Sequence, residues 1–189
     1  MFAAAHFQPK LRPLLQGARW AAAASLLALS LSALADEYAE VQRLSSSGAL
    51  VQALAKADAH LTAKPRDPQM RFMRGVILSE MGRKGEAEEI FLSLTRDYPE
   101  LPEPYNNLAA LLAARQELDA ARSALEMAVR NDPAYATAHE NLGDVQAQLA
   151  ARSYARALQL APSRQHIQLK LETLRRLLPS TDKPPTDKP

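Results

Sequence analysis

The chain has 189 residues, enough for one domain with terminal extensions but not for a second full domain. Good helix formers dominate and only six residues are glycine, which favours an all-helical fold. The formal net charge is +2, and removing the three basic residues of 1–35 from the total of 23 leaves 20 against 21 acidic ones. Such a neutral body excludes an electrostatic basis for nucleic-acid binding. The absence of cysteine excludes disulfides, zinc–thiolate sites and lipid attachment through cysteine.

Residues 1–35 have the pattern of a secretory signal peptide. A basic segment precedes an apolar stretch that begins at Trp20, and the small residues Ala33 and Ala35 stand at −3 and −1 of a cleavage site before Asp36. The apolar stretch is shorter than the roughly 20 residues that a membrane-spanning helix needs. We therefore expect export to the periplasm after cleavage near Ala35, with no integral membrane span in the mature chain. An uncleaved anchor and an amphipathic targeting helix are the alternatives.

From residue 36 onward the sequence repeats every 34 residues. Three sets of equivalent residues carry the period: Leu44, Leu78 and Leu112; Ala53, Ala87 and Ala121; and Pro65, Pro99 and Pro133. A fixed period of this length in helix-forming sequence is typical of stacked helix–turn–helix units. The expected units are 36–67, 68–101, 102–135 and a shortened 136–162.

Units 68–101 and 102–135 resemble the tetratricopeptide family (TPR) in the order of their small, large apolar, aromatic and proline positions. The residues that match are Gly75, Leu78, Ala87, Phe91 and Pro99, then Tyr105, Leu108, Ala109, Leu112, Ala121, Leu125, Ala128 and Pro133. The resemblance implies a right-handed α-solenoid of stacked helix–turn–helix units. Small residues at Gly75, Ala109 and Gly143 let the two helices of a unit approach closely. Phe91, Leu112 and Leu125 fill the space between units, and the prolines end each second helix.

Several positions depart from the family pattern. Arg71 and Arg74 replace the aromatic and the leucine of unit 68–101, so its first helix should pack less well. Gln116 stands at the turn position that Gly82 occupies one period earlier. The fourth unit lacks five residues where its turn should be. Residues from Ala136 to about Leu160 are therefore expected to form one nearly continuous helix, or else two helices with a minimal break.

Residues 163–178 are expected to form a helix that caps the solenoid, with Ser163 as its N-cap. Its leucines and its basic residues also fit a helix that lies on an anionic membrane surface, which is the alternative. Residues 179–189 are proline-rich and polar, as is typical of a disordered tail.

The sequence contains no pattern that indicates catalysis. The histidines outside 1–35 lie on different units without a second histidine one turn away, and His139 occupies the aromatic position of its unit, which favours core packing over metal binding. There is no glycine-rich phosphate loop and no nucleophile elbow. We expect no enzymatic activity, no cofactor and no metal site.

The family resemblance implies a ligand groove lined by the first helix of each unit. Its positions here, called the groove residues below, are Gln69, Phe72, Val76, Glu103, Asn106, Glu140 and Asp144. None of these residues, nor Ala110, is a lysine, which disfavours the carboxylate clamp of chaperone-binding members. The expected function is a non-catalytic scaffold of the cell envelope that binds a protein or peptide. The alternatives are an assembly factor that presents unfolded clients, by similarity to cytochrome c maturation proteins with such repeats, and a membrane-surface module acting through 163–178.

Overall fold

The computed structural model describes residues 37–178, so the expected signal peptide 1–35 and the expected tail 179–189 lie outside the described residues. The described part of the chain divides into two compact units, with the boundary between Lys56 and Ala57. In the first unit, a helix covers residues 37–46 and a second helix, α2 (Leu50–Ala63), begins; Val41, Leu44 and Ala53 are buried.

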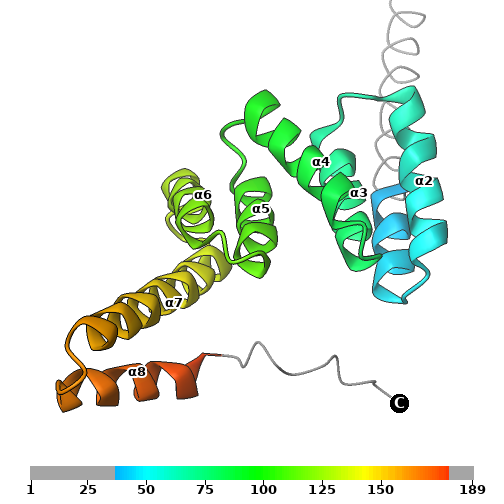
Figure 1. Cartoon of the computed structure of the whole chain (residues 1–189). Helices are drawn as coiled ribbons and strands as arrows, with labels where there is room; N and C mark the ends of the chain where they lie inside the picture. The colour runs from blue at the N-terminus through cyan, green and yellow to red at the C-terminus, as the bar shows by residue number, and fades with distance from the viewer. Residues whose placement is uncertain (1–36, 179–189) are drawn as a thin grey trace, which may run out of the picture. The chain divides into compact units, whose positions relative to one another are not determined.

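The second unit continues from the end of α2 through six further helices, and its described part contains no strand (Figure 1). These helices are α3 (Pro68–Glu80), α4 (Lys84–Asp97), α5 (Pro102–Ala114), α6 (Leu118–Asn131), α7 (Ala136–Leu160) and α8 (Gln165–Leu177). Each helix from α3 onward packs against the next one in the chain. The all-helical solenoid expected from the 34-residue period is therefore confirmed.

The ends of the helices follow from local chemistry. The Asp67 carboxylate accepts a hydrogen bond from the Met70 amide and caps α3, while Pro68 fills the first helical position, where its missing N–H is not needed. The second helices α4 and α6 end two residues before Pro99 and Pro133, as the sequence predicts.

The cores of the two complete hairpins consist of the residues that carry the repeat pattern. Phe91 is fully buried, and a Cβ added at Gly75 would lie only 2.7 Å from the Cε1 atom of its ring. Leu112 and Leu125 are also buried, at 9% and 1% exposure. Gly75 thus permits the close helix approach that the sequence predicts for its position.

The turns inside the units repeat with the same period of 34. Gly48 and Gly82 have φ = +78°, and Gln116, the only non-glycine residue with positive φ among those described, has φ = +63°. Gln116 therefore carries the steric strain of a left-handed conformation at a position where glycine has none. In the fourth unit this turn position is among the five missing residues, and α7 continues without a break there.

α7 is one unbroken helix of 25 residues, as expected from the missing turn (Figure 1). Two other predictions for this unit are wrong. Gly143 does not permit a close helix contact, because a Cβ added there would meet no heavy atom within 4 Å. His139 is exposed rather than part of the core, and its Nε2 lies 3.0 Å from the carbonyl oxygen of Pro133. Both errors have one cause: no second helix folds back over this part of α7.

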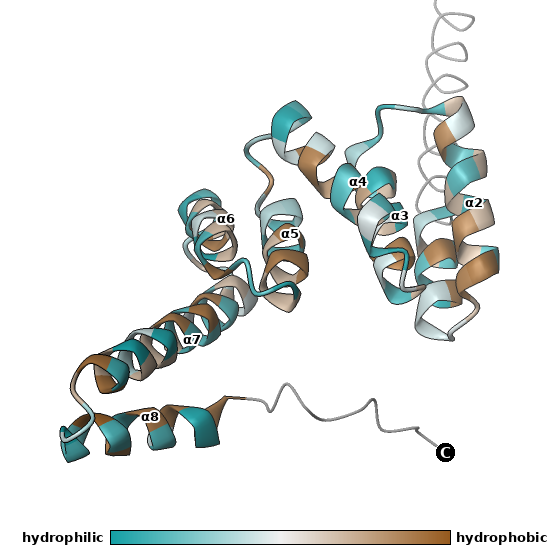
Figure 2. Ribbon diagram, in the orientation of Figure 1, coloured by the Kyte–Doolittle hydropathy of each residue, from teal (hydrophilic) through white to brown (hydrophobic). Residues whose placement is uncertain are grey.

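α8 packs against α7 and buries Ile167 and Leu171, while Leu169 and Leu177 are 63% and 75% exposed. Figure 2 shows apolar and polar residues on different sides of α8. The prediction that Ser163 caps this helix is wrong: Arg164 is the N-cap residue, no side chain caps the helix, and the backbone carbonyl of Ser163 accepts a bond from Gln165. Between residues 37 and 178, no helix combines the length and the apolar character that a membrane crossing requires.

Candidate functional site

The groove residues lie on the first helix of three successive units. Gln69, Phe72 and Val76 are on α3, Glu103 and Asn106 are on α5, and Glu140 and Asp144 are on α7. Within its unit, each occupies the second, fifth or ninth position of the repeat. In a solenoid, equivalent positions of stacked repeats form an extended binding face, and of these three first helices α5 and α7 contact each other directly.

A side-chain hydrogen bond joins this face between α5 and α7. Asn141 Nδ2 donates to Asn106 Oδ1 over 2.8 Å, and Asn106 is only 7% exposed. A buried amide needs such a partner, because an unsatisfied one is costly. Asn106 therefore holds two first helices in register, and Asn141 has a structural role.

The α3 end of the face is apolar. Phe72 and Val76 are half-buried, and the ring centroid of Phe72 lies 5.8 Å from that of Phe91 with the planes tilted by 49°. Such a tilted arrangement is favourable for two aromatic rings. Because Phe91 is fully buried, Phe72 rests on a fixed base and presents its remaining surface to solvent.

The α5 and α7 end of the face is acidic. Glu103, Glu140 and Asp144 are exposed, and none of them has an ion-pair partner within residues 37–178. The neighbouring Tyr135 has a raised pKa, chiefly because burial disfavours its phenolate and also because of the negative charge of Glu103. The groove residues thus combine an apolar end with uncompensated negative charge.

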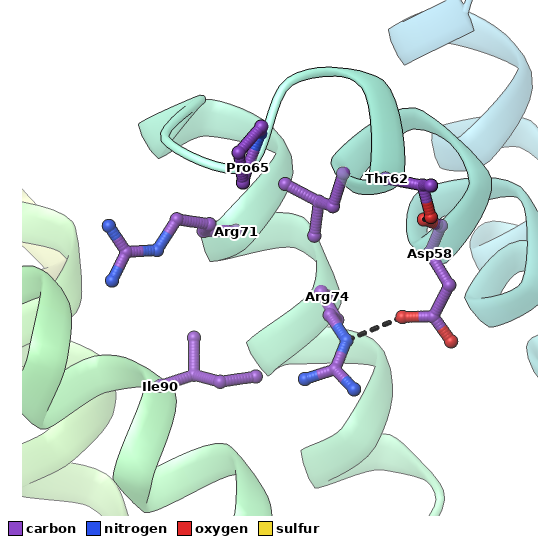
Figure 3. A pocket seen from close by; sticks show the side chains of 7 residues that line it. Asp58, Thr62, Pro65, Arg71, Arg74 and Ile90 are labelled. Atoms are coloured by element: carbon purple, nitrogen blue, oxygen red, sulfur yellow. Dashed lines mark hydrogen bonds and ion pairs between the residues drawn. The ribbon is translucent and has the colours of Figure 1, made fainter.

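A pocket of about 340 Å³ lies elsewhere in the second unit, between the end of α2 and the helices α3 and α4 (Figure 3). It is lined by Asp58, Leu61, Thr62, Pro65, Arg71, Arg74 and Ile90. Arg74 Nε donates to Asp58 Oδ1 over 2.6 Å across one side of the pocket (Figure 3). The pocket is therefore partly apolar, and one of its two arginines is already neutralised by a pocket carboxylate.

Arg71, the other arginine of the pocket, is held by residues that do not line the pocket. Its Nη2 donates to Ser93 Oγ at 2.9 Å and to Asp97 Oδ2 at 2.8 Å, and its guanidinium carbon lies 5.8 Å from the centre of the Tyr98 ring. Each of these contacts stabilises an arginine at a position where the family has an aromatic residue. Because Arg71 and Arg74 both have acidic partners, the pocket offers no uncompensated charge to a ligand.

Sequence reasoning identified Arg71 and Arg74 as departures from the repeat pattern but did not predict this pocket. The signal was present: an arginine in place of an aromatic residue removes a ring from the space between helices and leaves a hollow. What the sequence does not contain is the position of Asp58, 16 residues away from Arg74, which fixes the arginine at the rim.

No group of three or more histidine, cysteine or acidic side chains in the described part of the chain is arranged to hold a metal ion. His60 instead lies 2.9 Å from Asp67, the residue that caps α3, and is 8% exposed. It links the end of α2 to the start of α3, which is a structural role.

Solved structures of tetratricopeptide-repeat proteins share this architecture. TTC0263, a thermophilic TPR protein of Thermus thermophilus, is 24% identical, with a TM-score of 0.57 over 75% of this chain and 81% of its own. The first TPR of Spaghetti (RPAP3), bound to the HSP90 peptide SRMEEVD, is 18% identical, with a TM-score of 0.56 over 60% of this chain and 90% of its own. MamA 41-end from Desulfovibrio magneticus RS-1 is 19% identical, with a TM-score of 0.54 and 76% of each chain covered.

No protein-family model and no curated protein matches the sequence. The fold is established by the structural likenesses together with the 34-residue period, the buried repeat positions and the helical hairpins. The chain therefore has the tetratricopeptide-repeat fold.

Proposed function

We propose that this chain is a non-catalytic scaffold of the cell envelope that binds a partner polypeptide along the groove residues. The observation that carries the proposal is the set of exposed acidic side chains, Glu103, Glu140 and Asp144, on two successive first helices. Charges without an intramolecular partner do little for the fold, but they select and steer a ligand of opposite sign.

The partner segment that fits this face is basic at one end and apolar at the other. The half-buried Phe72 and Val76 offer an apolar surface for an anchoring side chain, since buried anchors supply most of the affinity at such interfaces. Lysine or arginine residues in the same segment would lie opposite the acids on α5 and α7. This ligand differs from SRMEEVD, the peptide bound to the first TPR of Spaghetti (RPAP3), which carries three acidic residues and would be repelled here.

The envelope location rests on the pattern of residues 1–35. A basic segment, a short apolar stretch and small residues before Asp36 support export and removal of that segment. The intact mass of the protein recovered from the exported fraction tests this part. We expect a chain that begins at Asp36, and a mass that includes residues 1–35 would contradict cleavage.

An array of immobilised peptides of varied sequence, each about as long as a groove-binding segment, tests the binding proposal. We expect the purified protein to bind peptides that combine lysine or arginine with a large apolar residue, and to lose them at high salt because the attraction is screened. Preference for acidic peptides, or binding that does not depend on peptide charge, would contradict the proposal. Capture of unfolded envelope proteins without regard to sequence would favour the assembly-factor alternative, and binding to anionic vesicles alone would favour the membrane-surface one.

A further inference from the structure

α7 carries the sequence patterns of both helices of a repeat unit within one continuous helix. In a complete unit the second helix has three apolar residues spaced by four and then three positions, with a proline five positions after the last. The three matching sets are Ala87, Phe91, Leu94 and Pro99; Ala121, Leu125, Ala128 and Pro133; and Ala150, Tyr154, Ala157 and Pro162. By this pattern the second half of α7 is a second helix, and its first half, with Leu142 and Gly143, is a first helix.

Both halves leave partly open the surfaces that are buried in the complete units. The pattern residues of α4 and α6 are at most 1% exposed, whereas Ala150, Tyr154 and Ala157 are all partly exposed. On the first helices, a Cβ at Gly75 would lie 2.7 Å from a ring of the second helix, but a Cβ at Gly143 would meet nothing within 4 Å. Each half therefore lacks the partner that its pattern implies.

The two halves cannot supply that partner to each other within one chain. In a complete unit the small positions of the two helices are 12 positions apart, as Gly75 and Ala87 are, and a turn lies between them. Gly143 and Ala150 are only seven positions apart. Seven residues are about two helical turns, so both lie on the same face of α7, about 10 Å apart along its axis.

We propose that two copies of this chain associate through α7 in an antiparallel pair, so that the first half of each α7 packs against the second half of the other. Residues that face each other across antiparallel helices have numbers with a constant sum. Placing Gly143 against Ala150 of the second copy thus places His139 against Tyr154 of the second copy. In this register Gly143 lies against the second-helix half of the other α7, as Gly75 lies against Phe91 and Ile90 of the second helix in a complete unit.

The arrangement is closed and self-complementary. Its two-fold axis passes between Gln146 and Ala147, and each copy completes the fourth unit of the other, as in a domain-swapped dimer. A short connection that prevents a hairpin from closing within one chain favours such an exchange.

α8 leaves this surface available. A second helix in this fold contacts the first helix of its own unit and that of the next, as α4 contacts both α3 and α5. α8 follows Pro162 as the next first helix would, buries Ile167 and Leu171 and places Lys170 Nζ 5.6 Å from the centre of the Tyr154 ring. It therefore contacts Tyr154 through Lys170 but leaves this ring partly exposed.

Charge favours the antiparallel direction. The acidic residues of α7, Glu140 and Asp144, are in its first half, and its basic residues, Arg152 and Arg156, are in its second half. An antiparallel pair brings the acidic half of one copy alongside the basic half of the other, whereas a parallel pair brings like charges together. The occupant of the open surface is thus a second copy of the same chain. Ala110 remains exposed in its complete unit at the position equivalent to Asp144, so completing the fourth unit does not bury this part of the groove face. Pairing does bring basic residues near Glu140 and Asp144, so the groove attracts a basic ligand more strongly in the single chain than in the pair.

Sedimentation equilibrium and single-cysteine crosslinking of the full chain test the pairing. The natural sequence has no cysteine, so one introduced thiol reports one position. We expect Gln146→Cys, next to the axis, to form a disulfide-linked dimer under mild oxidation, and Thr137→Cys, exposed at the start of α7, to remain a monomer on a denaturing gel. A protein that is monomeric at all concentrations, or equal crosslinking at the two positions, would overturn the proposal.

A bulky substitution separates pairing from folding. Gly143→Phe fills space that is open within one chain but would separate the paired helices, so it should weaken dimerisation at least about tenfold while the circular dichroism spectrum stays helical. Thr137→Phe, a matched addition outside the paired surface, should leave the dimerisation constant unchanged. Unchanged dimerisation of the Gly143→Phe variant would contradict the pairing, and neither result depends on whether the groove binds a peptide.

Discussion

The same substitution at the same repeat position has opposite consequences in two units. Gly75 and Gly143 both occupy the small position of a first helix. Replacing either with alanine improves intrinsic helix propensity by about 1 kcal/mol. At Gly143 nothing opposes this gain, because the added Cβ meets no heavy atom within 4 Å. We therefore expect Gly143→Ala to stabilise the protein by about 0.5–1 kcal/mol.

At Gly75 the added Cβ would lie 2.7 Å from Phe91 Cε1, 3.0 Å from Phe91 Cζ and 3.2 Å from Ile90 Cγ2. Phe91 is fully buried, so its ring has no open space into which it can move. Overpacking of this kind costs about 1–3 kcal/mol. The propensity gain is common to both variants, so their free energies of unfolding should differ by about this cost, with Gly75→Ala the less stable.

Urea unfolding followed by circular dichroism, at low protein concentration, measures both variants against the natural chain. The urea midpoint should be higher for Gly143→Ala than for the natural chain. The midpoint of Gly75→Ala should be lower than that of Gly143→Ala. Equal shifts in the two variants would refute the reasoning, because they would mean that α3 and α4 do not approach closely at Gly75 or that a helix does cover Gly143.

Three further predictions follow from single positions. Gln116→Gly should stabilise the protein by about 1 kcal/mol in urea unfolding, since it relieves a left-handed conformation at φ = +63°, and Gly82→Gln should destabilise it by a similar amount. Phe91→Ala should cost about 3–5 kcal/mol and Leu112→Ala about 2–5 kcal/mol, and thermal melts unchanged by either would contradict the packing between helices. Hydrogen bonds from Arg115 lower the pKa of Glu88, so this carboxylate stabilises the fold above its unfolded pKa and loses that contribution as the pH falls through its lowered folded pKa. Glu88→Gln should therefore reduce the loss of stability between about pH 5 and about pH 3, and an unchanged pH profile would show that the pair contributes nothing.

The complete repeat units could be predicted from the sequence because their residues make local and periodic contacts. Gly75 and Ala109 are 34 residues apart, and so are Phe91 and Leu125. That spacing alone determines which residues face each other in a helical hairpin. The long α7 was predictable for the same reason, since five missing residues leave no turn. His139 and Gly143 were assigned wrongly because the repeat pattern assumes a second helix that the shortened unit cannot fold back.

Side-chain interactions between units could not be predicted from the sequence. The bond from Asn141 to Asn106 and the ion pair of Arg74 with Asp58 depend on how neighbouring helices are placed, which the period does not specify. Ser163 was expected to cap α8 on residue type alone, but the turn after Pro162 makes Arg164 the N-cap residue. The groove residues were placed by repeat position, and the uncompensated charge of Glu103 became evident only once the ion pairs of the other acids were known.

The central claim is that the acidic end of the groove face binds a basic partner segment. It is tested most directly by titrating the natural chain and a Glu140→Lys, Asp144→Lys variant with one basic, apolar peptide selected on the array, at low and at high salt, with each protein kept monomeric below its dimerisation concentration. A control variant, Glu89→Lys with Glu100→Lys, changes the net charge equally at exposed acids outside the groove residues. We predict that the groove variant binds weakly with little salt dependence, while the control retains tight, salt-sensitive binding. Equal affinities for all three proteins, with helicity intact, would contradict the claim.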